Sequence, residues 1–182
     1  GYNSLDAVVG GSHNVAIGYD ALTTCAGNAS HNTGVGRDAL KTHNVDGDGN
    51  NTAIGSEAGT AVTDGVKNCL MGAGAGKAMN SGHENVILGY HAGDSTQNTG
   101  YSVIIGSEAC QADMTNATDG TIAIGKGAMA ALTTGGENIA IGYLSMDAMQ
   151  EGHNNIALGH HALGDCNNVG SDRNIVIGNY AA

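Results

Sequence analysis

Apolar and small residues recur along this chain in one short phrase, roughly Asn-x-Ala-Ile-Gly-x-x-Ala-Leu, which is repeated eleven times. Successive repeats begin 17 to 19 residues apart, and positions within a repeat are numbered here from its central glycine. These repeat glycines are Gly1, Gly18, Gly36, Gly55, Gly72, Gly89, Gly106, Gly125, Gly142, Gly159 and Gly178. A period this short and regular is typical of a solenoid, in which each repeat forms one coil stacked on the next.

Positions −3 to −1 predict a short strand in each repeat. Position −1 is always a large aliphatic residue, and position −3 is mostly β-branched, as pleated strands favour. Because side chains two residues apart share a face, we expect positions −3 and −1 to point into the coil. Position −2 points the other way, yet it is never polar. A strand that is apolar on both faces is normally covered on both, which predicts that other copies of the chain cover one of them.

Three further positions carry structural information. Position +3 is only Ala or Ser, which indicates close backbone approach, and position +4 is apolar and variable in size, which fits a second inward position. Position −4 is Asn in all but two repeats, where it is Ser102 and Thr121. Stacked coils would align these amides in a ladder, a structural role that we prefer to ligand binding.

Composition agrees with a thin rod. The chain has 31 Gly but no Pro, Phe or Trp, so it lacks the large rings that fill a conventional core. We therefore predict an all-β, repetitive parallel β-solenoid of about eleven coils that forms a single unit over residues 1–182. At about 4.8 Å per coil, ten intervals would span roughly 48 Å.

Charge, hydropathy and cysteine spacing argue against nucleic-acid binding, membrane insertion and disulfide bonds. The formal net charge of −11 argues against nucleic acid, and no long apolar run predicts membrane insertion. The four cysteines are expected to be free thiols, with Cys69 and Cys110 in inward positions. Cys25 and Cys166 share a repeat position but are eight coils apart, which is too far for a disulfide. Neither end of the chain resembles a cap, so we expect a segment of a longer fibre protein.

The repeats resemble those of the head domain of trimeric autotransporter adhesins, and still more those of phage tail fibres and other virion fibres. The matching stretches include Asn14–Gly18, Asn51–Gly55, Asn138–Gly142 and Asn155–Gly159, and the resemblance covers essentially the whole chain. It implies a left-handed parallel β-roll, a homotrimer, and a surface that either binds a target or spaces a receptor-binding tip. Its partners would be neighbouring fibre or virion proteins and a host-surface glycan or protein.

Two departures favour a viral fibre over a bacterial surface adhesin. These coils are longer than a typical adhesin head repeat, and the chain shows no neck motif, coiled-coil stalk or membrane anchor. The expected location is therefore the virion, after assembly in the host cytoplasm, with the bacterial cell surface as the alternative. The outer loops 41–50, 94–100 and 111–119 vary most and are the expected contact surfaces.

Several local motifs imitate binding sites. Met71–Lys77 resembles a phosphate loop but lacks the Ser or Thr that should follow the lysine, so we interpret it as part of the repeat. Asp46, Asp48 and Asn50 resemble the start of a calcium loop without its distal Glu. His160 and His161 are a weaker metal candidate, and we interpret the eight histidines as surface loop residues.

No residue set predicts catalysis. Tyrosines at position +1 could stack on sugar rings but more simply pack over neighbouring coils, because Arg37, Ser56, Lys126 and His160 share that position. We find no carboxylate pair or nucleophile–base set outside the repeat pattern, so the prediction is a structural and attachment protein, not an enzyme, with no cofactor. An ice-binding solenoid and a solenoid enzyme with a site built across chains remain the alternatives.

Overall fold

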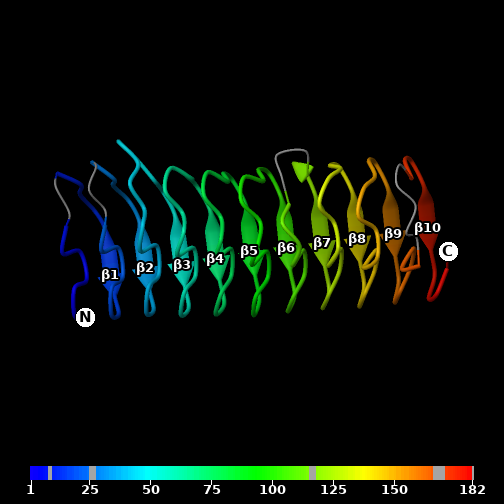
Figure 1. The fold of residues 1–182 in the computed structure, drawn as a ribbon, viewed down its shortest axis with the longest axis horizontal. Helices are drawn as coiled ribbons and strands as arrows, with labels where there is room; N and C mark the ends of the chain where they lie inside the picture. The colour runs from blue at the N-terminus through cyan, green and yellow to red at the C-terminus, as the bar shows by residue number, and fades with distance from the viewer. Residues whose placement is uncertain (8–9, 25–27, 115–117, 166–170, 182) are drawn as a thin grey trace.

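The computed structural model describes residues 1–7, 10–24, 28–114, 118–165 and 171–181. The chain forms an elongated β-solenoid with its coils stacked along one axis (Figure 1). Ten three-residue strands make one parallel sheet in chain order. They are β1 (Val15–Ile17), β2 (Thr33–Val35), β3 (Thr52–Ile54), β4 (Cys69–Met71), β5 (Val86–Leu88), β6 (Val103–Ile105), β7 (Ile122–Ile124), β8 (Ile139–Ile141), β9 (Ile156–Leu158) and β10 (Ile175–Ile177). The predicted all-β repetitive fold is confirmed.

Each strand pairs with the next at identical repeat positions. Ala53 of β3, for example, lies opposite Leu70 of β4, and Leu70 lies opposite Ile87 of β5. The loops between strands are 14 to 16 residues long. The variation in repeat length lies in these loops, so the strands stay in register along the whole sheet. The described residues hold ten strands for the eleven repeat glycines, and the first strand, β1, precedes the second of these glycines, Gly18.

The facing of the strands is the reverse of our expectation. The −2 side chains point into the coil, where Ala53, Leu70 and Ile104 are fully buried. The −3 and −1 side chains lie on the outer face of the sheet, where Met71 is 45% and Ile141 is 40% exposed. The interior of the coil is too narrow for the two side chains at positions −3 and −1, because it must also hold side chains from the opposite wall of each coil. The prediction that Cys69 points inward is wrong for the same reason, since it lies on the outer face.

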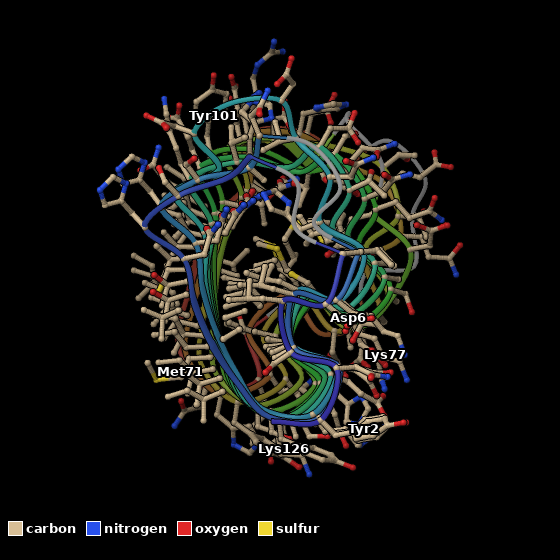
Figure 2. All side chains as sticks on the ribbon, turned by 90° about the vertical axis from the view of Figure 1, so that its left-hand side faces the viewer. Tyr2, Asp6, Met71, Lys77, Tyr101 and Lys126 are labelled. Atoms are coloured by element: carbon tan, nitrogen blue, oxygen red, sulfur yellow. The ribbon has the colours of Figure 1, made fainter. Side chains whose placement is uncertain are left out.

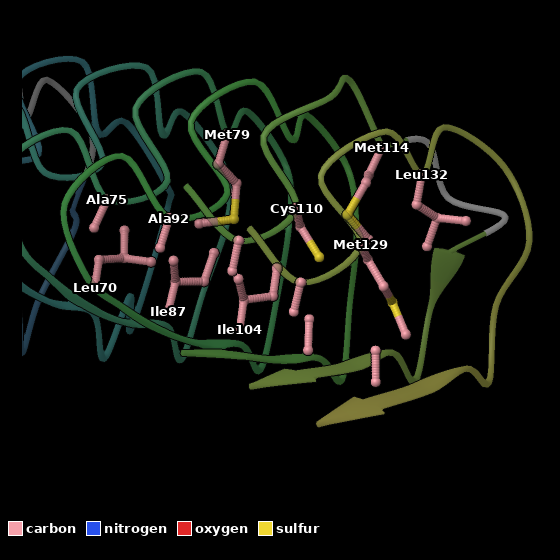
Figure 3. Close-up of a cluster of buried hydrophobic side chains, with 14 of the residues drawn as sticks. Leu70, Ala75, Met79, Ile87, Ala92, Ile104, Cys110, Met114, Met129 and Leu132 are labelled. Carbon is pink, nitrogen blue, oxygen red and sulfur yellow. The ribbon is translucent and has the colours of Figure 1, made fainter. Parts of the chain in front are cut away.

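Position +4 supplies the opposite wall, as predicted, and in most coils it is complementary in size to position −2. The exception is the coil with Ala53 and Gly59, where Leu70 of the next coil occupies the space beside Gly59. Coils with Leu70 and Ile87 at position −2 have Gly76 and Gly93 at position +4, whereas the coil with Ala140 at position −2 has Met146 at position +4. A Cβ added to Gly76 would lie 3.1 Å from Leu70 Cδ2. The large side chains therefore cross the interior from either wall, and the glycines leave room for them (Figure 3).

A third inward row comes from the loops. Seven residues after the repeat glycine, Val62, Met79, Leu132 and Met149 are fully buried, and Met114 takes this place one residue later in its own coil. Together the three rows form a continuous apolar core along the axis. The interior is thin enough to be filled without any Phe or Trp.

Left-handed backbone conformations form the corners of every coil. Among the described residues, all 25 non-glycine residues with positive φ fall at positions −5, +2 or +4. They include bulky residues such as Leu40 (φ 49°) and Met146 (φ 54°), which rarely adopt this conformation. Their recurrence in successive coils shows that stacking of the coils compensates the local strain.

The repeat glycine marks the closest approach between coils. Its φ lies near +138° in coil after coil, a region that side chains avoid. A Cβ at Gly89 would also lie 2.6 Å from the carbonyl oxygen of Gly106 in the next coil. Both the conformation and the space therefore require glycine at this position.

The predicted asparagine ladder is present and buried. The amide of Asn68 donates to Asn51 Oδ1 in the preceding coil (3.1 Å) and to the Gly82 carbonyl in the following coil (2.7 Å). Asn68 Oδ1 in turn accepts from the backbone and side-chain nitrogens of Asn85. Ser102 continues the row by donating its backbone N–H to Asn85 Oδ1 (3.0 Å). The ladder satisfies polar groups that would otherwise be unpaired at the edge of the core.

The complementarity between positions −2 and +4 predicts an energetic coupling. Leu70→Ala should lower the free energy of unfolding by about 2–5 kcal/mol because it leaves a cavity. Gly76→Leu alone should overpack the same space. The double variant should be more stable than the sum of the single effects predicts, by about 0.5–3 kcal/mol, because it restores one large and one small residue per coil. Urea denaturation of the four proteins measures this coupling, and strict additivity would contradict the size rule.

Candidate functional site

The outer face of the sheet is the feature that most needs a functional explanation. Positions −3 and −1 present two parallel rows of mostly aliphatic side chains along the ten strands, with Thr33, Thr52 and Cys69 as the exceptions. The most exposed of them are Val15, Ile17, Ile54, Met71, Ile141, Ile175 and Ile177, each at least 36% exposed. Figure 2 shows this face from the end of the rod, with Met71 projecting away from the coil. A continuous apolar strip of this length is unusual on the surface of a soluble monomer.

Polar corners border this apolar face on both sides. In Figure 2, Tyr101 at position −5 lies at one edge, and Lys126 and Tyr2 at position +1 lie around the turn at the other edge. Both border positions vary in residue type from coil to coil, whereas the rows between them stay almost uniformly aliphatic. An apolar centre with a polar rim is the arrangement expected of a protein–protein interface.

Several basic side chains are paired with acids of the same or a neighbouring coil. Lys41 Nζ lies 2.9 Å from Asp20 Oδ2 and 2.8 Å from Asp38 Oδ1, and these hydrogen bonds raise the pKa of Lys41. Glu57 is held by Lys77 (2.7 Å) and by Arg37, and these two hydrogen bonds lower the pKa of Glu57 to about 2. Such exposed pairs contribute little to stability, but they neutralise the charges of these basic side chains.

Exposed aromatic rings of neighbouring coils contact one another beside this face. Tyr2 and Tyr19, at position +1 of consecutive coils, are stacked with centroids 5.5 Å apart. Near the other end, His160 lies between Tyr143 (5.2 Å) and Tyr180 (4.6 Å). The rings therefore pack over neighbouring coils, as we expected, while all six tyrosines stay at least 48% exposed.

The calcium-like residues have separate partners. Asn28 donates to Asp46 Oδ1 (2.7 Å), and His31 donates to Asp48 Oδ1 (2.9 Å). Asn50 occupies the left-handed corner at position −5. Across the described ranges, no group of three or more His, Cys, Asp or Glu residues is arranged to hold a metal ion.

The histidine pair and the phosphate-loop lookalike also have structural roles in the coils. The rings of His160 and His161 are 6.4 Å apart and nearly perpendicular, and His161 lies 3.7 Å from Asp147. In the phosphate-loop lookalike, Gly72 is a repeat glycine, Gly76 is a corner, and Lys77 is paired with Glu57. No pocket is detected in the part of the chain that the structure describes.

Each of the three outer loops also contributes buried side chains. Loop 41–50 carries His43, loop 94–100 carries Thr96 and Thr99, and loop 111–119 carries Met114, all of which are fully buried. The interpretation of all histidines as surface residues is therefore wrong for His43, which takes the place that Val62 and Met79 fill in the next coils. Counting seven residues from each repeat glycine would have revealed this inward row in the sequence.

His43 is a polar residue in an apolar row. Its Nε2 accepts a long hydrogen bond from the ladder residue Asn51 (3.4 Å), and its Nδ1 has no hydrogen-bond partner among the described residues. Burial lowers the pKa of His43 to about 4, against smaller opposing effects of the Thr63 backbone and Asp64. The ring is therefore neutral at pH 7 and becomes costly to keep buried in acid.

The thiols differ in accessibility. Cys69 and Cys110 are both free. Cys110 lies in the core at position +4, as predicted, and burial raises the pKa of its thiol to about 12. Cys69 is partly exposed on the outer face. Cys25 and Cys166 lie outside the described residues.

Comparisons with known proteins give no family for this chain. No protein-family model, curated protein or solved structure matches it. No helix among the described residues is long and apolar enough to cross a membrane.

The buried imidazole predicts an acid-sensitive fold. Because the pKa of His43 falls from about 6.5 unfolded to about 4 folded, its contribution is fully present above pH 6.5 and is lost as the pH falls toward 4. The loss at pH 4 should be about 3 kcal/mol. His43→Met, which copies the methionines of this row, should remove that part of the pH dependence in urea denaturation. His153→Gln, at an exposed histidine, should not. An unchanged pH profile in His43→Met would contradict the assignment.

Proposed function

We propose that this chain is a segment of a homotrimeric fibre, either its shaft or its head, that carries or supports attachment to a host surface. The observation that carries the proposal is the pair of aliphatic rows on the outer face of the sheet. Burying these rows against another chain would stabilise the assembly by roughly 25 cal/mol for each Å² of apolar surface removed from water.

The repeat itself selects the partner for this face. Each row of side chains recurs once per coil, at the strand spacing of about 4.8 Å. A partner that fills every gap between side chains must present apolar groups at the same spacing over the whole length. A second copy of this chain meets that requirement without any further constraint on sequence.

The number of copies and the biological setting come from the resemblance of the repeats. Related repeats occur in trimeric adhesin heads and in virion fibres, which favours three parallel chains around a common axis. The longer coils favour the virion fibre over a bacterial adhesin head. The adhesin head is the alternative, because its chains could associate through the same outer face. Multiple copies would add avidity to any weak contact made by the loops.

Native mass tests the assembly. We expect a particle of three times the 18.1 kDa chain mass by light scattering or native mass spectrometry. Met71→Asp, which places a charge in the middle of the apolar face, should shift the particle toward 18.1 kDa without loss of β-sheet signal in circular dichroism. The control is Asn80→Asp, which adds the same charge at an exposed residue about half a coil away. A wild-type monomer would contradict the proposal, and a dimer would retain the covered face but exclude the trimer.

Thiol labelling tests which face is covered. In a Cys25→Ser, Cys166→Ser background, Cys69 should resist maleimide in the assembled protein and react once Met71→Asp separates the chains. Cys110 should stay unreactive in both because it is fully buried. Equal labelling of Cys69 in the assembled and separated proteins would show that the chains associate through another surface.

Attachment is tested separately from assembly. Fluorescently labelled assembled protein is applied to a panel of bacterial cells, with the Met71→Asp monomer as the control. A binding head should label cells more strongly as the assembly than as the monomer, because its copies act together. Absence of labelling by the assembly would identify the segment as a shaft.

A further inference from the structure

Two exposed histidines are stacked on each other at one corner of the rod. His13 and His31 occupy position −5 of consecutive coils, both with left-handed backbones (φ 60° and 62°). Their rings are 4.8 Å apart between centroids and only 4° from parallel. The backbone N–H of His31 donates to the Ser12 carbonyl (3.0 Å), which holds the two coils together at this point.

The Nδ1 atoms of both rings are already engaged. His31 Nδ1 lies 2.9 Å from Asp48 Oδ1, and since an ionised carboxylate can only accept, the Nδ1 of His31 must carry the proton. His13 Nδ1 lies 2.9 Å from the hydroxyl of Ser12, which can either accept from it or donate to it. The lone pair of neutral His31 is then on Nε2, and that of His13 is on Nε2 when the Ser12 hydroxyl accepts. Neither Nε2 has a partner among the described residues.

We propose that His13 and His31 bind one divalent transition-metal ion through their Nε2 atoms, with Asp48 orienting His31 from behind. A neutral imidazole whose other nitrogen donates to a carboxylate is the usual form of a metal-binding histidine. The pair provides two protein ligands, and water completes the coordination. Imidazole nitrogen suits Cu²⁺, Ni²⁺ and Zn²⁺, and Cu²⁺ should bind most tightly of the three.

Both rings must turn before they can share an ion, because the Nε2 lone pairs of parallel rings do not converge. Metal–nitrogen bonds of about 2.0–2.1 Å place two ligand nitrogens roughly 3–4 Å apart. Both side chains are exposed, so the rings can rotate out of their parallel stack and turn their Nε2 atoms toward a common ion without moving packed neighbours. The bound ion would tie the first coil that carries a strand to the second, and the net charge of −11 would favour a cation.

Other histidines in the chain lack one of these features. His160 and His161 are nearly perpendicular and lie against tyrosine rings. His91 donates to Asp94 but has Tyr90, not a second imidazole, beside it. Within the described residues, parallel imidazoles on consecutive coils with engaged Nδ1 atoms occur at His13 and His31.

Calorimetry with Cu²⁺ tests the site on the full chain, and the pulsed paramagnetic resonance spectrum of the bound Cu²⁺ identifies its imidazole ligands. We expect one ion per chain whose spectrum shows two imidazoles. His13→Asn and His31→Asn should each abolish this two-imidazole spectrum and weaken binding at least tenfold. Asp48→Asn should weaken binding about tenfold while keeping both imidazoles, as expected for a residue that acts through His31. Lowering the pH should weaken binding because protons compete for the nitrogens.

The control is His153→Asn, which removes an exposed histidine that is not stacked on another imidazole. It should leave the affinity and the spectrum unchanged. The proposal is overturned if His13→Asn and His31→Asn bind as the wild type does, or if the spectrum shows a single imidazole. An unchanged affinity in Asp48→Asn would overturn the orienting role of that carboxylate. These outcomes do not depend on whether the chain forms a trimer.

Discussion

The whole structure depends on one constraint: each coil must hydrogen-bond to the next at the same repeat positions along the entire rod. The strands do so in register, and the corners and loops do so through backbone bonds such as Gly89 N–H to the Met71 carbonyl (2.8 Å). These hydrogen bonds fix the distance between successive coils. That distance leaves no space for a Cβ at the repeat glycines and allows Asn side chains to reach both neighbouring coils. Substitution is therefore restricted at the stacked positions and free at the positions that point into solvent.

Much of this architecture could be predicted from the sequence. The spacing of the glycines predicts the coils, the small residues at position +3 predict buried corners, and the Asn residues at position −4 predict the ladder. These signals are reliable because each comes from a backbone requirement that recurs with the period. The left-handed corners were less visible, because residues as different as Leu40, Glu57 and Tyr101 occupy them. The stacking that compensates their strain is a property of the assembled coils and leaves no preference in any one repeat.

The facing of the strands could not be derived from hydrophobicity, because both faces are apolar. The informative signal is size: Leu70, Ile87 and Ile104 at position −2 coincide with Gly76, Gly93 and Cys110 at position +4. Such compensation is expected of two walls that share one interior, and positions −3 and −1 show none of it. The same comparison of inward rows, extended seven residues past the glycine, identifies His43 as a core residue. The pairing of His13 with His31 was beyond sequence analysis, since it depends on ring orientation.

The distribution of charge bears on how identical rods could share their outer faces. In a parallel assembly around a common axis, residues at the edges of the face approach neighbouring copies at the same height, so an unpaired charge would be repeated several times within a short distance. Five of the six basic residues form ion pairs with acids of their own chain: Arg37, Lys41, Lys67, Lys77 and Lys126. Each chain thus neutralises these bases before it meets another copy. The rows between the edges carry no ionisable side chain except Cys69. The apolar face itself can therefore be buried against identical copies without burying a charged side chain, which is the electrostatic condition that the proposed assembly requires.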